Sequence, residues 1–328
     1  MLILNAEAVQ AALPMGEVIE ATKRAYTALS SNKAELPIRS QLHVPPYQGT
    51  SLIMPAFVDL EDEEAMAVKI VSVFPNNPRL GLPLIHAAVV VLEAQTGKPI
   101  ALLEGGALTA IRTGAASGAA TDLLARQDST TAAIFGAGRQ ARTQLEAICT
   151  VRSLESVWIY DLNPDHVKTF IKEMAGQDPI PTNLRAAPSP EVALAEADII
   201  CTATTSTKPV FPDEALSPGT HINGVGSYTL DMIEVPPKTA GRATVFIDSQ
   251  EAALEEAGEL VAALNQGLLS TANMIELGDV LLGNAPGRTH NDEITFFKSV
   301  GIAVQDAIAA RLALRNATKL GLGQQVDW

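Results

Sequence analysis

The chain has 328 residues, of which 47% are hydrophobic, 18% charged and 4% aromatic. This composition is typical of a globular protein, and the length suits two domains. The 37 acidic and 23 basic residues give a net charge of −14, which argues against nucleic acid or an anionic membrane as a partner. With two cysteines and no Cys/His cluster at metal-ligand spacing, we expect no disulfide framework and no metal site. The sequence contains no membrane span or signal peptide, so we expect a cytoplasmic protein.

Residues up to about 125 do not alternate between strand and helix. Their apolar pattern predicts a helix over residues 17–30 and strands over residues 40–44, 51–57, 65–73, 85–93 and 99–103. Gly97 suits a hairpin turn between the last two strands. A helix of small residues is predicted over residues 107–125. Short strands joined by turns indicate an antiparallel or mixed sheet in an α+β domain.

Residues 131–161 predict a strand, a glycine turn, a helix and a second strand. The turn from Gly136 to Ala141 fits the dinucleotide-binding pattern G-x-G-x-x-G/A. Gly136 permits the tight turn, Gly138 lets backbone N–H groups approach a pyrophosphate, and the helix N-terminus attracts the phosphates. Asp161 ends the second strand, where a carboxylate accepts the ribose hydroxyls and repels a 2′-phosphate. This favours NAD (as NADH) and leaves NADP(H) as the alternative, whereas the structural alternative is a glycine turn that only joins strand to helix.

Strands and helices alternate after Asp161. Helices are predicted over residues 164–175 and 190–195, and strands over residues 184–186, 199–202, 221–225 and 244–247. The alternation predicts an α/β fold with a doubly wound parallel Rossmann sheet, which binds ligands beyond the carboxyl ends of its strands. An amphipathic helix predicted over residues 294–314 returns to the first domain. We therefore predict a Rossmann domain, residues 120–295, inserted into an α+β domain made of residues 1–119 and 296–328.

Three cations of the first domain lie in apolar or closely packed sequence. They are Arg39 after Leu36-Pro-Ile, Lys69 inside the predicted strand 65–73, and Arg112 in the helix of small residues. A buried lysine must find an anion or lose its proton, because an unpaired buried charge is costly. Taken singly, each cation is more typical of a structural ion pair. Together, beside a dinucleotide site, they indicate a clamp for a substrate carboxylate. By this reasoning, a Lys69 bound to a protein carboxylate would overturn the assignment as an enzyme.

Several stretches together resemble the ornithine cyclodeaminase/mu-crystallin family. They are Arg39 and residues 67–73, 81–83, 108–117, 136–141 and 292–301. The runs Thr109-Ala-Ile-Arg-Thr113 and Phe297-Lys-Ser-Val-Gly301 are the most specific, and the resemblance covers essentially the whole chain. It implies a Rossmann domain inserted into a substrate-binding and dimerisation domain whose sheets associate across two subunits. The expected partners are therefore a small imino or amino acid and a second copy of the chain.

The resemblance also implies roles for individual residues. It places the substrate carboxylate on Arg39, Lys69 and Arg112, with Lys69 as the catalytic candidate and Tyr228 and Val300 as further substrate contacts. It places the cofactor on the glycine turn and on residues at the ends of strands. These are Thr113, Gly136, Gly138, Arg139, Gln140, Asp161, Thr202, Thr204, Val225, Gly226, Ser227 and Ser299.

One departure from the family pattern bears on the activity. After the predicted strand 221–225, the cyclodeaminases have Gly-Asp and then Pro, and the Asp transfers a proton in catalysis. This chain has Ser227-Tyr228 and then Leu230 at these positions. Glu234 matches the family pattern. The ordinary pKa of a phenol is about 10 against about 3.9 for Asp, so Tyr228 would need a shift of roughly three units to act as a base near neutral pH.

Reduction of a cyclic imine needs no such base. An iminium carbon beside a carboxylate accepts hydride directly when both are held in near-attack geometry, and Lys69 can bond the carboxylate or supply the proton of the nitrogen. We therefore expect an NAD(P)-dependent oxidoreductase of the pyrroline-2-carboxylate or ketimine reductase type. The alternatives are ornithine cyclodeamination, reductive amination as in archaeal alanine dehydrogenases, and a mu-crystallin-like binding protein. The sequence does not tell which imino, oxo or amino acid is the substrate.

Overall fold

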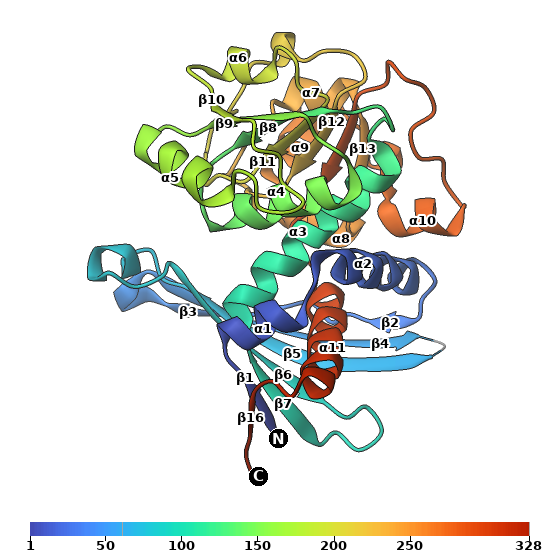
Figure 1. The fold of residues 1–328 in the computed structure, drawn as a ribbon. Coiled ribbons are helices and arrows are strands. Elements are labelled where there is room, and N and C mark those ends of the chain that lie inside the picture. Colours follow the sequence, from blue (N-terminus) through green and yellow to red (C-terminus); the bar gives the residue numbers. More distant parts are fainter. Residues whose placement is uncertain (61, 328) are drawn as a thin grey trace. The chain divides into compact units, whose positions relative to one another are not determined.

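The computed structural model describes residues 1–60 and 62–327 and divides the chain into two compact units (Figure 1). Unit 1 comprises Met1–Arg112 and Ile302–Trp328, and unit 2 comprises Thr113–Gly301, so that unit 2 is inserted into unit 1 along the chain. The first boundary falls within helix α3 (Gly105–Leu124). The sequence prediction placed the boundaries at 119/120 and 295/296, and the second of these would cut strand β15 (Thr295–Lys298).

Unit 1 contains an eight-stranded mixed sheet. Its strand order is β16 (Gln324–Gln325), β1 (Leu2–Leu4), β7 (Pro99–Glu104), β6 (Ile85–Leu92), β5 (Glu63–Val73), β4 (Gly49–Leu60) and β2 (Ala34–Glu35), with β3 (Ser40–Val44) also paired to β4. Strands β1 and β7 are parallel, and the other pairs are antiparallel. The sheet is thus of the antiparallel or mixed kind that the sequence predicted for this part of the chain.

Helices cover one face of this sheet. Helices α1 (Ala6–Ala12), α2 (Met15–Ser30) and α11 (Ala303–Leu320) lie on the same side, and α11 contacts β4 and β5 (Figure 1). Strand β5 alternates accordingly, because Ala67, Lys69 and Val71 are buried beneath the helices while Ile70 is 44% exposed. The period of two thus fixes which β5 residues can reach α11.

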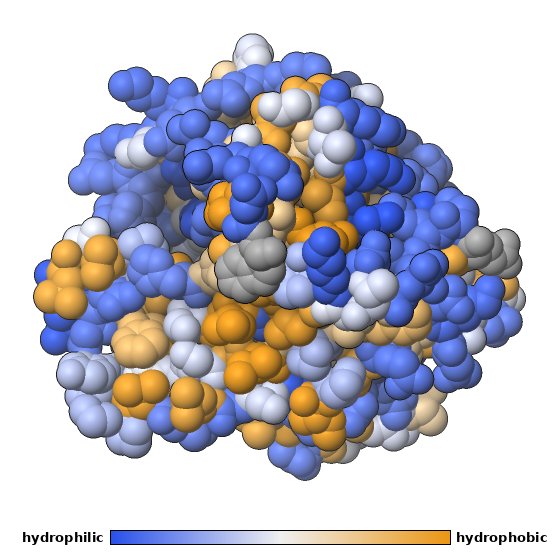
Figure 2. All heavy atoms as spheres, turned by 90° about the horizontal axis from the view of Figure 1, so that it is seen from below, coloured by the Kyte–Doolittle hydropathy of each residue, from blue (hydrophilic) through white to orange (hydrophobic). Residues whose placement is uncertain are grey.

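The opposite face of the sheet carries apolar side chains that no helix in the described part of unit 1 covers. Cross-strand pairing aligns them in two rows, which we call the uncovered face: Ile53, Ile70 and Ala88, and beside them Pro55, Val68, Val90 and Leu102. Figure 2 views this side and shows apolar residues gathered across it. An apolar surface of this extent is typical of a protein interface.

Unit 2 contains an eight-stranded sheet in which every pair is parallel. The order is β10 (Leu184–Ala186), β9 (Ser156–Tyr160), β8 (Thr131–Phe135), β11 (Ile199–Thr202), β12 (His221–Gly224), β15, β13 (Thr244–Ile247) and β14 (Met274–Glu276). The chain winds outward from β8 in both directions, so the topological switch point lies between β8 and β11. The predicted doubly wound Rossmann sheet is confirmed.

Both faces of this sheet are buried, as its near-continuous apolar strands require. Alternate residues of β8 face opposite ways: Ala132 and Ile134 pack with α4 (Arg139–Val151) and α5 (Pro164–Met174), whereas Ala133 and Phe135 belong to a second cluster. That second cluster includes residues of the remaining helices around the sheet. They are α6 (Pro190–Leu194), α7 (Pro237–Arg242), α8 (Gln250–Glu256) and α9 (Gly258–Asn265).

The helix predicted over residues 294–314 was wrong at its start. Residues 295–298 form β15 between β12 and β13, and helix α11 begins only at Ala303. Thr295, Phe296 and Phe297 are β-prone and fully buried in the sheet, and Gly301 then turns the chain with a φ of 81°. A short strand and the first turns of a long helix, with apolar residues at compatible spacing, fitted the pattern of one amphipathic helix.

A short helix α10 (Leu277–Leu282) follows β14 and completes the helices of unit 2. No helix in the described part of the chain combines the length and apolar character that crossing a bilayer requires.

Candidate active site

The turn between β8 and α4 has a backbone that glycine alone supports at its first position. Gly136 has a φ of 95°, and a β-carbon there would lie 2.7 Å from the carbonyl oxygen of Ala203. Gly138 is the N-cap of α4 and leaves the first N–H groups without a side-chain partner, while a β-carbon at Gly138 would meet nothing within 4 Å. Unpaired helix donors beside open space form an arrangement that binds phosphate.

Two charged side chains hold this turn. Asp161 accepts hydrogen bonds from the backbone N–H of Ala137 at 2.9 Å and of Asn163 at 2.8 Å. Arg142, one turn into α4, donates to the carbonyl oxygens of Ala137 at 3.0 Å and Gly138 at 2.8 Å. Asp161 therefore lies beside the turn, whereas Arg142 is a supporting residue that the sequence analysis missed.

Parallel pairing brings several predicted cofactor residues to one edge of the sheet. Thr202 pairs with Phe135 on one side and with Gly224 on the other, and Gly224 pairs with Lys298. The chain segments that follow these strands leave from the same edge as the glycine turn. They contain Thr204, Val225, Gly226, Ser227, Ser299 and Val300.

The hydroxyl groups at this edge are turned toward buried carboxylates. Thr202 and Thr204 donate to Glu234, Ser227 donates to Glu259 at 2.5 Å, and Ser299 donates to Asp248 at 2.8 Å. These segments therefore present mainly backbone on their other side. The sequence analysis assigned the hydroxyl residues and did not foresee the three acids that bind them, although each acid follows or interrupts an apolar run.

The other predicted site residues of unit 2 differ in how exposed their side chains are. Thr113 is buried in α3, and Arg139 is exposed at the start of α4, where Gln140 follows it. The Val300 N–H donates to Asp248 at 3.0 Å. Tyr228 is partly buried in the segment after β12, and this burial raises the pKa of its phenol. Tyr228 therefore stays protonated near neutral pH.

Two of the predicted cations of unit 1 share one buried carboxylate. Asp306 of α11 lies 2.5 Å from Nζ of Lys69 and 3.0 Å from Nε of Arg112. Arg112 also donates to Oε1 of Gln305 at 2.7 Å, and the Gln305 amide donates to the hydroxyl of Tyr26 at 2.6 Å. Lys69 and Arg112 are 2% and 5% exposed. Lys69 thus makes the contact that the sequence reasoning had set against an enzyme.

The charges of this group show why that criterion was too strict. Asp306 neutralises one of the two cations, so the group formed by Lys69, Arg112 and Asp306, which we call the cation cluster, keeps an excess positive charge. Burial lowers the pKa of Lys69 to about 8; Asp306 raises this pKa, and the positive charges of Arg112 and Arg39 lower it. A buried excess charge is stabilised by an anionic ligand. The ion pair with Asp306 is therefore compatible with a carboxylate site.

Sequence comparison places the chain in a known family. The sequence model of the Ornithine cyclodeaminase/mu-crystallin family matches residues 1–320. The chain belongs to this family. The resemblance that the motifs indicated is thereby confirmed over nearly the whole chain.

The relatives of this chain include reductases, dehydrogenases and a lysine cyclodeaminase. A Delta(1)-pyrroline-2-carboxylate reductase of Bacillus cereus is 40% identical over 331 residues, covering 100% of both chains. The structure of the Delta(1)-pyrroline-2-carboxylate reductase of Thermococcus litoralis in complex with NADH and L-proline has a TM-score of 0.94 at 41% identity and covers 99% of this chain and 100% of that one. An archaeal alanine dehydrogenase dimer with bound NAD has a TM-score of 0.91 at 31% identity and covers 100% of this chain and 99% of that one.

Proposed function

We propose that this protein reduces the cyclic imino acid Δ1-pyrroline-2-carboxylate to proline with a reduced nicotinamide dinucleotide. The observation that carries the proposal is the cation cluster, because two buried cations against one carboxylate leave a positive charge for the carboxylate of a small substrate. The open space at Gly138 and the unpaired donors of α4 suit the pyrophosphate of such a cofactor. The names and ligands of the relatives support the same reaction.

The residues of the chain divide the work of this reaction. A bound reduced nicotinamide supplies the hydride that adds to the imine carbon. Arg112 and Lys69 bind the carboxylate, which holds the imine carbon in one orientation. The imine nitrogen gains a proton, either from solvent before binding or from Nζ of Lys69, so that the C=N bond gains one hydrogen at carbon and one at nitrogen. The protonated phenol of Tyr228 is no base, which favours imine reduction over a cyclodeamination that needs one.

Substrate comparison tests this proposal directly. NADH absorbance is followed with pyrroline-2-carboxylate, with piperideine-2-carboxylate, and with pyruvate plus ammonia. We expect rapid NADH oxidation with pyrroline-2-carboxylate and formation of proline. Faster turnover of pyruvate with ammonia, or ammonia release from ornithine without net NADH oxidation, would replace the proposed reaction by one of the alternatives.

The pH dependence of kcat/KM tests the role of Lys69. The pKa of Lys69 is lowered from 10.5 to about 8, so the amine is charged below about pH 8 and neutral above it. We expect kcat/KM for the imino acid to fall as the pH rises through this value, because the cation cluster then loses its excess charge. In Lys69→Arg the decrease of kcat/KM near pH 8 should be absent, since a guanidinium stays charged. The ratio of kcat/KM between this variant and the wild type should therefore rise with pH. Lys69→Met should lower kcat/KM by roughly 10²–10³-fold, as expected when one partner of a buried charge pair is lost. An identical pH profile in Lys69→Arg would contradict this role.

We also infer that NADH is preferred to NADPH. Asp161 lies against the glycine turn, and its carboxylate keeps acceptor capacity beyond the bonds to Ala137 and Asn163. A ribose 2′-hydroxyl can donate to this carboxylate, whereas a 2′-phosphate is repelled by it.

Removal of one charge tests this preference. In Asp161→Asn the amide oxygen can still accept from the Ala137 N–H, although the bond from the Asn163 N–H is lost, and we expect the ratio of the NADPH and NADH dissociation constants to fall by about tenfold. The matched control is Asp165→Asn, which removes an equal charge from an exposed position in the first turn of α5. Fluorescence titration measures both constants. Equal effects of the two substitutions would mean that Asp161 acts only as a general surface charge.

We further propose that two copies of this chain associate through the uncovered face. Ile53 and Ile70 are 42% and 44% exposed there on adjacent strands, although their row is apolar. The solved alanine dehydrogenase relative is a dimer.

Light scattering after size exclusion tests the association. We expect the wild-type protein at twice the mass of one chain and Ile70→Glu at the mass of one chain, because association would bury the new carboxylate. Leu320→Glu is the matched control, since Leu320 is 60% exposed at the end of α11 and outside the uncovered face. A dimeric Ile70→Glu protein would exclude this face as the interface.

A further inference from the structure

Glu234 is a fully buried carboxylate that binds the ends of two neighbouring strands. Beyond β11 it accepts hydrogen bonds from Oγ1 of Thr202 at 3.0 Å and from both the N–H and Oγ1 of Thr204, at 2.6 and 2.8 Å. Beyond β12 it accepts from the N–H groups of Gly226 at 2.7 Å and Ser227 at 3.1 Å. One side chain thus joins the two segments at the carboxyl edge of the sheet.

The backbone around Glu234 is packed too closely to admit a side chain at position 226. A β-carbon on Gly226 would lie 2.3 Å from the carbonyl oxygen of Thr204 and 2.4 Å from Oε1 of Glu234. The same segment also packs against the glycine turn, because a β-carbon on Gly136 would meet the carbonyl oxygen of Ala203. Glu234 therefore fixes segments that also support the glycine turn.

The hydrogen-bond geometry favours the ionised form of Glu234. Three of its five donors are backbone N–H groups, which can only donate, so a protonated carboxyl would lose acceptor capacity. Burial and the negative charge of Glu259 raise the pKa of Glu234, whereas the positive charge of Lys298 and the Thr204 donors lower it. Lys298 is buried, lies 3.2 Å from Oε1 of Glu259 and donates to the carbonyl oxygen of Ser227 at 2.7 Å. The strand ends thus enclose two carboxylates and one ammonium group.

We propose that Glu234 is a positioning residue for hydride transfer, which it supports by fixing the backbone at the ends of β11 and β12. The family resemblance assigns Thr202, Thr204, Gly226 and Ser227 of this edge to cofactor binding, so the inference rests on the proposed function. Displacement of reacting groups by about 1 Å can lower the rate roughly 10²-fold. The gain in rate from a rigid strand end can therefore offset the cost of burying the Glu234 carboxylate. The carboxylate acts through the backbone and need not touch the substrate.

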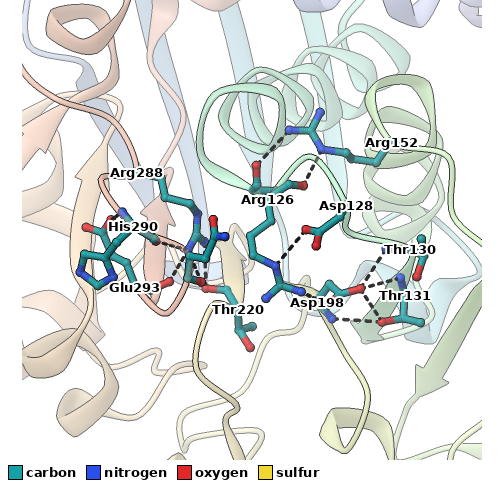
Figure 3. A network of polar contacts seen from close by, with 12 residues as sticks. Arg126, Asp128, Thr130, Thr131, Arg152, Asp198, Thr220, Arg288, His290 and Glu293 are labelled. Carbon is teal, nitrogen blue, oxygen red and sulfur yellow. Dashed lines mark hydrogen bonds and ion pairs between the residues drawn. The ribbon is translucent and has the colours of Figure 1, made fainter.

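A second carboxylate provides a matched control at the other edge of the same sheet. Asp198 accepts hydrogen bonds from the N–H groups of Thr130 at 2.9 Å and Thr131 at 3.1 Å, and from Nη2 of Arg126 at 2.5 Å (Figure 3). Thr131 begins β8, and Asp198 directly precedes β11, so these bonds tie the amino ends of the two strands. Asp198 resembles Glu234 in its bonding but lies at the edge opposite the glycine turn.

The experiment compares Glu234→Gln with Asp198→Asn. In Glu234→Gln the new NH₂ group faces backbone donors on either side. In Asp198→Asn it faces the guanidinium of Arg126 when the amide oxygen accepts from Thr130 and Thr131. Both substitutions should therefore lower thermal stability. We expect Glu234→Gln to lower kcat by about 10²-fold while KM for the imino acid changes less than about threefold. The isotope effect with 4-deuterated NADH should rise toward its intrinsic value, and Asp198→Asn should keep kcat within about twofold of wild type.

Hydrogen exchange of the protein without cofactor gives a readout independent of catalysis. Glu234→Gln should speed exchange at the amides of Thr204, Gly226 and Ser227, whereas Asp198→Asn should speed it at Thr130 and Thr131. Equal losses of kcat in the two variants at equal stability, or unchanged exchange at the strand ends, would overturn the positioning role. Should Glu234→Gln fail to fold, Thr202→Val removes one donor, keeps the charge, and should give the same pattern at smaller size.

Failure of the proposed reaction remains distinguishable from failure of this inference. If wild-type protein turns over another substrate, the ratio of Glu234→Gln to Asp198→Asn is measured with that substrate. If it turns over none, the exchange rates and the NADH affinity decide, and an unchanged strand end with unchanged affinity would refute the inference.

Discussion

The sharing of one buried carboxylate by two cations is the constraint on which the chemistry of unit 1 depends. Asp306 makes the burial of Lys69 and Arg112 tolerable, yet it leaves one positive charge uncompensated in a place with little access to water. The hydrogen bonds from Arg112 to Gln305 and from Gln305 to Tyr26 then hold the guanidinium in one orientation. A small anion is the ligand that such a group stabilises, and this connects an ion pair of the apo fold to the binding of a carboxylate.

Local sequence patterns predicted most of the fold because they act over short distances. The strand, turn and helix over residues 131–151 need only the β-prone run, the two glycines and a helix without Pro or Gly, and the structure has these elements as β8, the turn and α4. The error at residues 294–302 arose where local patterns compete. Phe297 and Val304 fit a helical spacing, but the parallel pairing of β15 with β12 and β13 and the turn at Gly301 depend on residues far away in the chain.

Residues of the candidate site that belong to a local sequence motif could be predicted. Residues that bind them from distant parts of the chain could not. Lys69 and Arg112 could be singled out as charges in apolar surroundings, but Asp306 lies 237 and 194 positions from them. Its signal was an acid within the small and apolar residues of α11. Glu234, Asp248 and Glu259 carry a similar signal, since each is a buried acid that binds polar or charged groups. The expectation that an ion pair of Lys69 would speak against an enzyme was too strict for a related reason. It considered Lys69 and one carboxylate, whereas the total charge of Lys69, Arg112 and Asp306 decides whether an anion is stabilised.

The inward-turned hydroxyls have a consequence for how one scaffold serves several reactions. At the carboxyl edge of the Rossmann sheet, buried acids fix Thr202, Thr204, Ser227 and Ser299, so this edge offers mostly backbone to a cofactor. Backbone is insensitive to substitution, and relatives with TM-scores of 0.94 and 0.91 accordingly keep the fold while their reactions differ. The choice of reaction must then come from a few side chains on flanking segments. On the proposed function Tyr228 is one of these, since a partly buried phenol that keeps its proton is not the base that a deamination needs and leaves hydride addition unaffected.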